Sequence, residues 1–169
     1  MDNDQCNAEG YLSRITERLK KKGFVVNRNV LYNNQVFEYV ARKTKFEIER
    51  FGFSTTIFIF GRFTTPDMPL LTDFSVKSFK YAKKTSGIHP PYGLLYVLVC
   101  FPVAIADSID IYTAEAIRKK EPPKHWAAFE KLAVFSLEHR MLYYSEASPT
   151  WGSMYHDRDR QTINEMLAP

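Results

Sequence analysis

Four lysines on one side of a predicted helix give this chain its most uneven distribution of charge. The helix is expected from about Thr72 to Thr85. Its basic residues are Lys77, Lys80, Lys83 and Lys84. Lysines neutralise phosphates and release counterions, so this face suits a nucleic acid, whose bases could also stack on exposed tyrosines. The basic runs at 20–22 and 118–120 are candidates to extend it, and a solvated helix face without a ligand is the alternative.

Three glutamates on neighbouring predicted strands have a spacing that a divalent cation could use. Glu47 and Glu49 alternate with Ile48 and therefore point to one side of a strand, and Glu38 lies on the strand before. Carboxylates from two strands are typical magnesium ligands. The alternative is that they are charged residues on the solvent face of a half-exposed strand.

The predicted order of elements resembles the core of the restriction-endonuclease-like proteins. That order is a helix, several antiparallel strands, a helix, a strand and a helix. The resemblance implies a magnesium-dependent phosphodiesterase, with a carboxylate on one strand and an acid-x-Lys pair on the next. Glu38, Glu47 and Glu49 are the nearest residues here, but Arg50 follows Glu49 and no acid-x-Lys pair occurs at that place.

Histidines and cysteines have no spacing typical of a metal site. They are His89, His125, His139, His156, Cys6 and Cys100. Cys100 lies in an apolar run whose burial would raise the thiol pKa, so we expect no nucleophile there. A glycine-rich phosphate loop and a Gly-x-Ser-x-Gly motif are both missing from the sequence. We therefore expect no metal and no cofactor, except magnesium under the nuclease hypothesis.

A C-terminal segment carries residue types that often anchor protein interfaces. Trp151, Tyr155 and Arg158 fall within eight positions. They could form a homo-oligomer or partner surface. In the alternative interpretation Trp151 covers one end of the sheet, and residues 157–160 form ion pairs at the start of a helix.

Composition indicates one folded domain with a basic surface. The 169 residues are 45% hydrophobic and 15% aromatic, and the formal net charge is +4. That length suits a single domain over 1–169. The polar start of the chain and its two distant cysteines favour a cytosolic location. We expect no membrane span, because the longest apolar run, Tyr92–Ala106, is too short and contains Pro102.

We expect an α+β fold with a mainly antiparallel sheet, three to four helices packed largely on one side of it, and a buried central strand at 92–106. The helices are predicted at about 9–22, 72–85, 108–120 and 157–167. The strands are predicted at 24–31, 36–43, 45–51 and 53–63, followed by a hairpin at 134–137 and 141–145. Phe46 should point inward, Pro102 should interrupt strand pairing, and 124–131 could be helical or extended.

These patterns favour a non-catalytic cytosolic interaction module. Its partner would be a nucleic acid or an accessory protein, bound through the lysine-rich helix face. A nuclease-like phosphodiesterase is the alternative from a different class, and a structural subunit that uses the segment around Trp151 is a third hypothesis.

Overall fold

The computed structural model describes residues 7–47, 52–87, 95–125, 128–147 and 153–169. Within these ranges the chain forms four helices and one eight-stranded sheet. The helices are α1 (Ala8–Lys21), α2 (Met68–Thr85), α3 (Ile111–Lys119) and α4 (Ser153–Leu167). The strands are β1 (Val25–Tyr32), β2 (Gln35–Glu47), β3 (Gly52–Phe63), β4 (Tyr96–Ala106), β5 (Lys124–His125), β6 (Ala128–Glu130), β7 (Ala133–Ser136) and β8 (Met141–Tyr144). The α+β prediction is confirmed.

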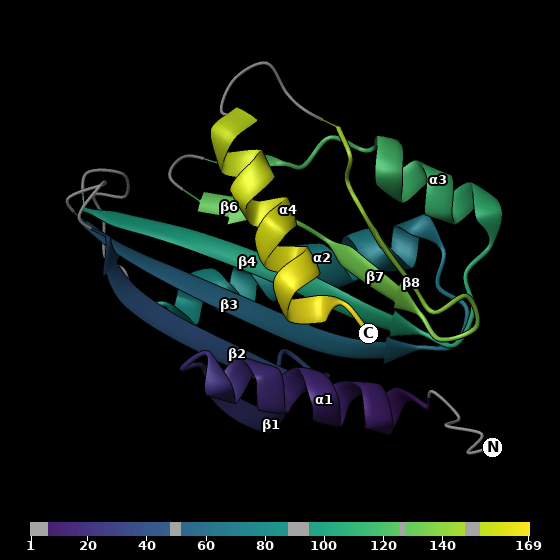
Figure 1. The fold of residues 1–169 in the computed structure, drawn as a ribbon, viewed down its shortest axis with the longest axis horizontal. Coiled ribbons are helices and arrows are strands. Elements are labelled where there is room, and N and C mark those ends of the chain that lie inside the picture. Colours follow the sequence, from purple (N-terminus) through teal and green to yellow (C-terminus); the bar gives the residue numbers. More distant parts are fainter. Residues whose placement is uncertain (1–6, 48–51, 88–94, 126–127, 148–152) are drawn as a thin grey trace.

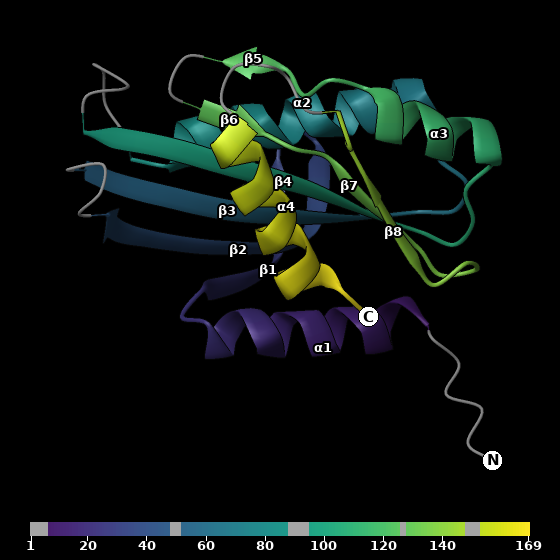
Figure 2. The ribbon, with the colours of Figure 1, turned by 45° about the horizontal axis from the view of Figure 1, so that its top comes forward.

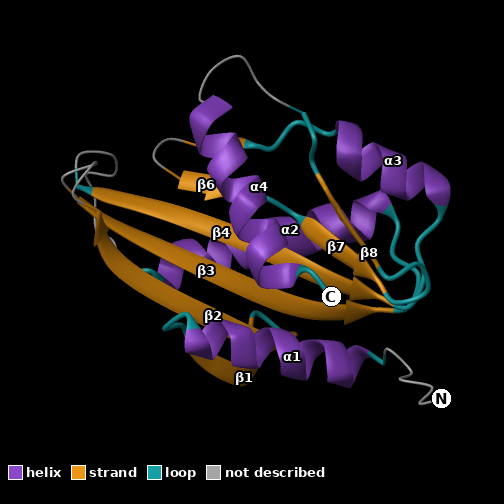
Figure 3. Ribbon diagram, in the orientation of Figure 1, coloured by secondary structure: helices purple, strands orange, loops and turns teal. Residues whose placement is uncertain are grey.

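The sheet combines an antiparallel meander with a parallel centre (Figures 1 and 3). β1, β2 and β3 follow one another antiparallel, and β4 then pairs parallel to β3. A parallel neighbour requires a crossover, which α2 supplies between β3 and β4. β6 and β7 pair with the other edge of β4, and β5 and β8 complete the sheet.

Helices cover both faces of the sheet, so the prediction that they pack largely on one side is wrong. α2 and α3 lie over one face, and α1 lies over the other (Figure 2). α4 packs on the α1 face through Ile163 and Leu167. The physical reason is that β3 and β4 are apolar on both sides: Ile57 and Cys100 face α2, whereas Phe58 and Phe101 face α1.

β4 is the buried central strand, beginning at Tyr96; residues 92–94 of the predicted strand lie outside the described part of the chain. Pro102 keeps its register with Ile59 of β3. On the other edge, the neighbour of β4 changes from β6, which ends opposite Cys100, to β7, which begins opposite Val103. The predicted interruption therefore affects one edge only, where proline has no N–H to donate.

β2 is one long strand, although the sequence predicted two. Asn29 of β1 has a left-handed φ of 50°. It forms no pair with Glu38, although the flanking pairs Arg28–Tyr39 and Val30–Phe37 keep one register. This distortion changes which face the side chains occupy: Phe37 packs against α2, whereas Tyr39 packs on the α1 face. Phe46 is 55% exposed, so its predicted inward position is also wrong.

Helix ends follow local sequence signals, but two starts were predicted too late. Gly23 adopts φ 84°, and the Phe24 N–H donates to Leu19 O, so α1 ends close to its predicted boundary at residue 22. The N-cap of α2 is Asp67, ahead of the predicted start near Thr72, because Pro69 fits the first turn of a helix. α4 begins at Ser153, ahead of the predicted Asp157 or Asp159.

The predicted β7–β8 hairpin is confirmed, and the described residues of 124–131 are extended. Near the termini, the Tyr11 hydroxyl of α1 donates to Leu167 O at 2.7 Å, and the Tyr11 ring stacks on Phe135 with centroids 3.8 Å apart. These contacts join α1, α4 and the sheet.

None of the described helices is both long and apolar enough to cross a membrane.

Gly61 allows α2 to approach the sheet closely, which predicts a penalty for any side chain there. A Cβ at this position would lie 2.7 Å from Cε2 of Phe74. We expect Gly61→Ala to lower the free energy of unfolding by about 1–3 kcal/mol, measured by urea denaturation. In a Phe74→Leu background the same change should cost clearly less. An equal loss in both backgrounds would contradict this explanation.

Candidate nucleic-acid interface

The four predicted lysines lie on the outer side of α2. Lys80, Lys83 and Lys84 are exposed, and Lys77 is partly exposed and pairs with Asp73 at 2.6 Å. The Lys84 ammonium lies 5.6 Å from the centroid of the Tyr32 ring. The aromatic face attracts the ammonium group, which restrains the lysine side chain without neutralising its charge. α2 thus presents a row of four lysines, of which Lys77 pairs with Asp73.

Only one of the two other basic runs shares this face. The run at 20–22 closes α1 on the opposite face of the sheet and does not extend the row. The run at 118–120 ends α3, beside the first half of α2, where Lys120 Nζ donates to Thr72 Oγ1 at 3.0 Å. Arg118 and Lys119 of this run pair with Glu146 and Glu115, so Lys120 is the residue that places a positive charge beside α2.

Arg42 of β2 adds a positive charge at the C-terminal end of α2, which the sequence did not reveal. Its guanidinium donates to the carbonyl oxygens of Thr85 and Ser86, each at 2.7 Å. These bonds satisfy carbonyls that a helix end leaves unpaired. They also fix the side of β2 from which Arg42 projects, which is the α2 side.

Beyond the end of α2, three exposed aromatic rings form a row across adjacent strands. Phe46 pairs with Phe53, and Phe53 pairs with Tyr96, in direct register. Their ring centroids are 5.2 Å and 5.6 Å apart. Phe46 lies four positions after Arg42 on β2, so its side chain is on the α2 side as well. The row is therefore on the same face as the lysines.

The exposure of these rings is unusual for aromatic side chains in strands. Phe46 is 55% exposed, Phe53 41% and Tyr96 37%. Cross-strand aromatic pairs stabilise a sheet by roughly 0.2–1 kcal/mol each, which accounts for the contacts but not for their position at the surface. Sequence reasoning missed the row, because residues 46, 53 and 96 become neighbours only once strand register is known.

The structure places two of the three predicted metal ligands far apart. Glu38 and Glu47 belong to the same strand, nine positions and therefore roughly 30 Å apart. Glu49 lies outside the described residues. The adjacent strand β3 contains no carboxylate at all, and no group of three metal-ligating side chains occurs in the described part of the chain. The geometry gives the nuclease hypothesis no support.

A buried carboxylate on β6 joins two polar groups that sequence reasoning did not connect. Glu130 is 3% exposed; it accepts from Ser75 Oγ at 2.5 Å and contacts His125 Nε2 at 2.9 Å. The His125 ring also stacks on Phe79 with centroids 4.0 Å apart. Because the carboxylate lies between them, Ser75 and His125 make no nucleophile–base pair of the kind acyl transfer needs. The network fixes β5 and β6 against α2.

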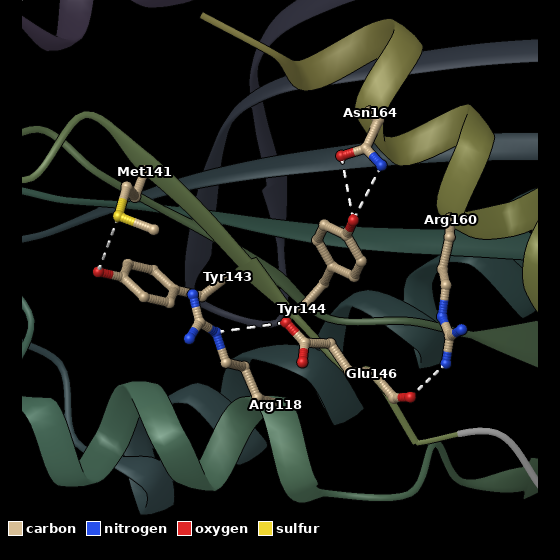
Figure 4. Close-up of polar contacts among 7 residues, drawn as sticks. All are labelled: Arg118, Met141, Tyr143, Tyr144, Glu146, Arg160 and Asn164. Carbon is tan, nitrogen blue, oxygen red and sulfur yellow. Dashed lines mark hydrogen bonds and ion pairs between the residues drawn. The ribbon is translucent and has the colours of Figure 1, made fainter.

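Polar contacts fix the strand β8 between α3 and α4 (Figure 4). Arg118 Nε of α3 lies 3.4 Å from Glu146 Oε1, and its guanidinium lies over the Tyr143 ring. The Tyr144 hydroxyl donates to Asn164 Oδ1 at 3.1 Å, and Arg160 donates to the carbonyl oxygen of Glu146 (Figure 4). Tyr143 and Tyr144 of β8, together with Glu146, which follows the strand, thus contact both helices.

The predicted interface residues are only partly described. Trp151 lies outside the described residues, and Tyr155 belongs to α4 although its side chain is not described. Arg158 is exposed on α4 and lines a cavity above the sheet. The expected ion pair is present, since Arg160 Nη1 lies 3.6 Å from Asp157 Oδ1, but it lies inside α4 because the helix begins at Ser153.

The position of Cys100 predicts an unreactive thiol. The side chain is fully buried, and this burial, followed by the nearby Glu130 carboxylate, raises the pKa of the Cys100 thiol well above its usual value. In a Cys6→Ser variant, we expect alkylation at pH 8 to be slow and limited by unfolding. Mass spectrometry would measure it, with the same variant in urea as control. Rapid modification of the folded protein would contradict this prediction.

Comparisons with known proteins assign no function to this interface. No protein-family model, no curated protein and no solved structure matches this chain. The resemblance to the restriction-endonuclease-like core therefore stays one of element order alone. A shared order of elements does not determine activity, because one fold can support many functions.

Proposed function

We propose that this protein is a non-catalytic module that binds single-stranded nucleic acid. The binding surface, here called the α2–aromatic surface, consists of Lys77, Lys80, Lys83 and Lys84 together with Phe46, Phe53 and Tyr96. The observation that carries the proposal is the row of exposed rings at the end of a lysine-rich helix on the same face of the sheet. Cationic side chains beside exposed rings are typical of proteins that bind single strands.

The two halves of this surface make complementary contributions. Lysines attract phosphates over a range of about 8–10 Å at ordinary salt and supply affinity without sequence preference. An unpaired base can stack on an exposed ring, and each such contact contributes about 1–3 kcal/mol. A duplex keeps its bases stacked inside, so the aromatic row gives a reason to prefer single strands.

An accessory protein is the second candidate partner, and the same rings favour it, because aromatic side chains often anchor protein interfaces. Nucleic acid remains the first candidate partner because of the positive charge of α2.

We also propose a cytosolic location. It is supported by Cys100, which is a free, buried thiol, as is usual in a reducing compartment.

Neutralising exposed lysines of α2 should weaken binding and its dependence on salt. We expect Lys80→Gln/Lys84→Gln to bind a fluorescein-labelled 20-nucleotide DNA or RNA less tightly, with the slope of log K against log [salt] smaller by up to about 0.7 per lysine lost. Fluorescence anisotropy at several salt concentrations measures both. The matched control is Lys20→Gln/Lys21→Gln on the opposite face, and equal losses in the two variants would show only a non-specific charge effect.

Removing the central ring of the row should weaken single-strand binding specifically. We expect Phe53→Leu to lower the affinity for single strands about 5- to 100-fold, the equivalent of one stacked base, with little change for a duplex. Tyr112→Leu on α3 is the control, because Tyr112 is 83% exposed but lies away from the row. If neither strand type binds at low salt, the proposal is wrong, and an accessory protein becomes the candidate.

A further inference from the structure

β1 is the longest edge strand of the described sheet. The strand order places it at one end of the sheet, where it pairs with β2 and with no other strand of the described residues. β1 has eight residues, whereas the strands at the other borders, β5 and β8, have two and four. Along such an edge, every second residue directs its N–H and C=O groups away from the sheet. β1 therefore offers a template on which a further strand can pair.

No residue of β1 is buried, although the strand is largely apolar at its two ends. Val25 is 67% exposed and Leu31 is 71% exposed. Leu31 lies directly opposite Val36 of β2, which is 56% exposed. Single exposed apolar side chains are common on protein surfaces, but these three lie on or beside one edge strand. The edge thus combines backbone groups with apolar side chains, which are the two components that β-strand addition uses.

The charge along β1 is positive. The strand contains Arg28 and no acidic residue, and Arg28 is exposed. The part of β2 that pairs with β1 contains one carboxylate, Glu38, and one guanidinium, Arg42. At the end of β1, the Lys84 ammonium of α2 lies over the ring of Tyr32. An added strand with acidic side chains therefore complements the charge of this edge.

Strand register places Arg28 and Leu31 on the same face of the edge. Arg28 pairs with Tyr39, whose ring packs on the α1 face and has its centroid 5.0 Å from the Arg28 guanidinium. Val30 packs on the α2 face, so the next residue, Leu31, projects on the α1 face. A partner strand therefore meets a cation and an apolar side chain on one face. An acidic residue beside Arg28 and an apolar residue beside Leu31 match this arrangement.

The centre of β1 disfavours pairing between two copies of this chain. An antiparallel pair around a two-fold axis near the middle of β1 would bring the two Arg28 side chains close together, and like charges on paired strands are destabilising. Asn29, with its left-handed φ of 50°, also distorts the edge, and such distortions reduce association between identical edges. An acidic segment of another protein removes the charge repulsion, and it can pair with the regular residues on either side of Asn29.

We propose that β1 is a docking edge for an extended acidic segment of another protein, which adds a strand to the sheet. Main-chain hydrogen bonds to β1 supply affinity. Carboxylates beside Arg28 and Lys84, together with an apolar side chain beside Leu31, supply specificity. The proposal does not depend on nucleic-acid binding by the α2–aromatic surface, although Lys84 belongs to that surface as well.

Fluorescence anisotropy with a labelled ten-residue peptide of alternating glutamate and valine tests the edge. We expect saturable binding, weakened at least threefold by Arg28→Gln and at least tenfold by Leu31→Glu, which removes an apolar side chain and adds a negative charge. Ile111→Glu is the matched control and should leave the affinity unchanged, because Ile111 is 68% exposed on α3 rather than on β1. Thermal denaturation without peptide verifies that every variant is folded. Absence of saturable binding, or equal losses in Leu31→Glu and Ile111→Glu, would overturn the proposal.

Two further peptides separate the contributions of charge and backbone pairing. A peptide of alternating lysine and valine keeps the backbone but reverses the charge. The glutamate–valine peptide with N-methylated backbone amides keeps the charge but cannot donate hydrogen bonds to a strand. Each should bind at least tenfold more weakly than the unmodified acidic peptide. Equal binding of the N-methylated peptide would show that charge alone attracts it, which contradicts strand addition.

Amide hydrogen exchange followed by NMR identifies the edge that the peptide occupies. We expect bound peptide to slow the exchange of alternate β1 amides and to leave β5 and β8 unchanged; unchanged β1 amides at saturation would overturn the proposal. Sedimentation velocity without peptide tests the other occupant, because a dimer that Leu31→Glu dissociates would assign the edge to a second copy instead. Phe53→Leu should leave peptide affinity unchanged, so failure of the α2–aromatic surface and failure of this edge are separately visible.

Discussion

The parallel pairing of β3 and β4, two strands that are apolar on both sides, constrains the rest of this structure. A strand of this kind can be stable only if both faces are covered, because exposing either would leave large apolar side chains in water. The connection between parallel neighbours must also cross over one face, and α2 does this. α1 and α4 then cover the opposite face, which produces two hydrophobic clusters separated by the sheet.

The aromatic row follows from a mismatch of length between strands and helices. β2 has 13 residues and β3 has 12, so each extends for roughly 40 Å. α2 has 18 residues and α4 has 15, so they reach only about 27 Å and 22 Å. The strands therefore project past their covering helices at one end of the sheet. The aromatic row lies there on the α2 face.

The character of each face of the sheet depends on which side chains alternate along the same strands. On β2, Arg42 and Phe46 project on the α2 face of the sheet, whereas Lys43 and Lys45 project on the face that α1 and α4 cover. Consecutive residues of one segment thus supply an aromatic platform on one face and basic side chains on the other. A change at one face need not disturb the other, which is why variants on the two faces can be compared as independent probes.

The sequence by itself determined the α+β class, the central apolar strand, the end of α1, the hairpin and the lysine row of α2. Each of these features can be predicted from local periodicity, turn residues or charge, because these patterns depend only on residues that are close in the sequence. Only the tertiary structure decided that helices cover both faces, that Phe46 is exposed, and that Glu38 and Glu47 are far apart. It also decided that residues 46, 53 and 96 form one row and that β1 lies at an edge of the sheet. These facts depend on strand pairing and register and on one local distortion at Asn29, and a single shift of register would move every side chain to the other face.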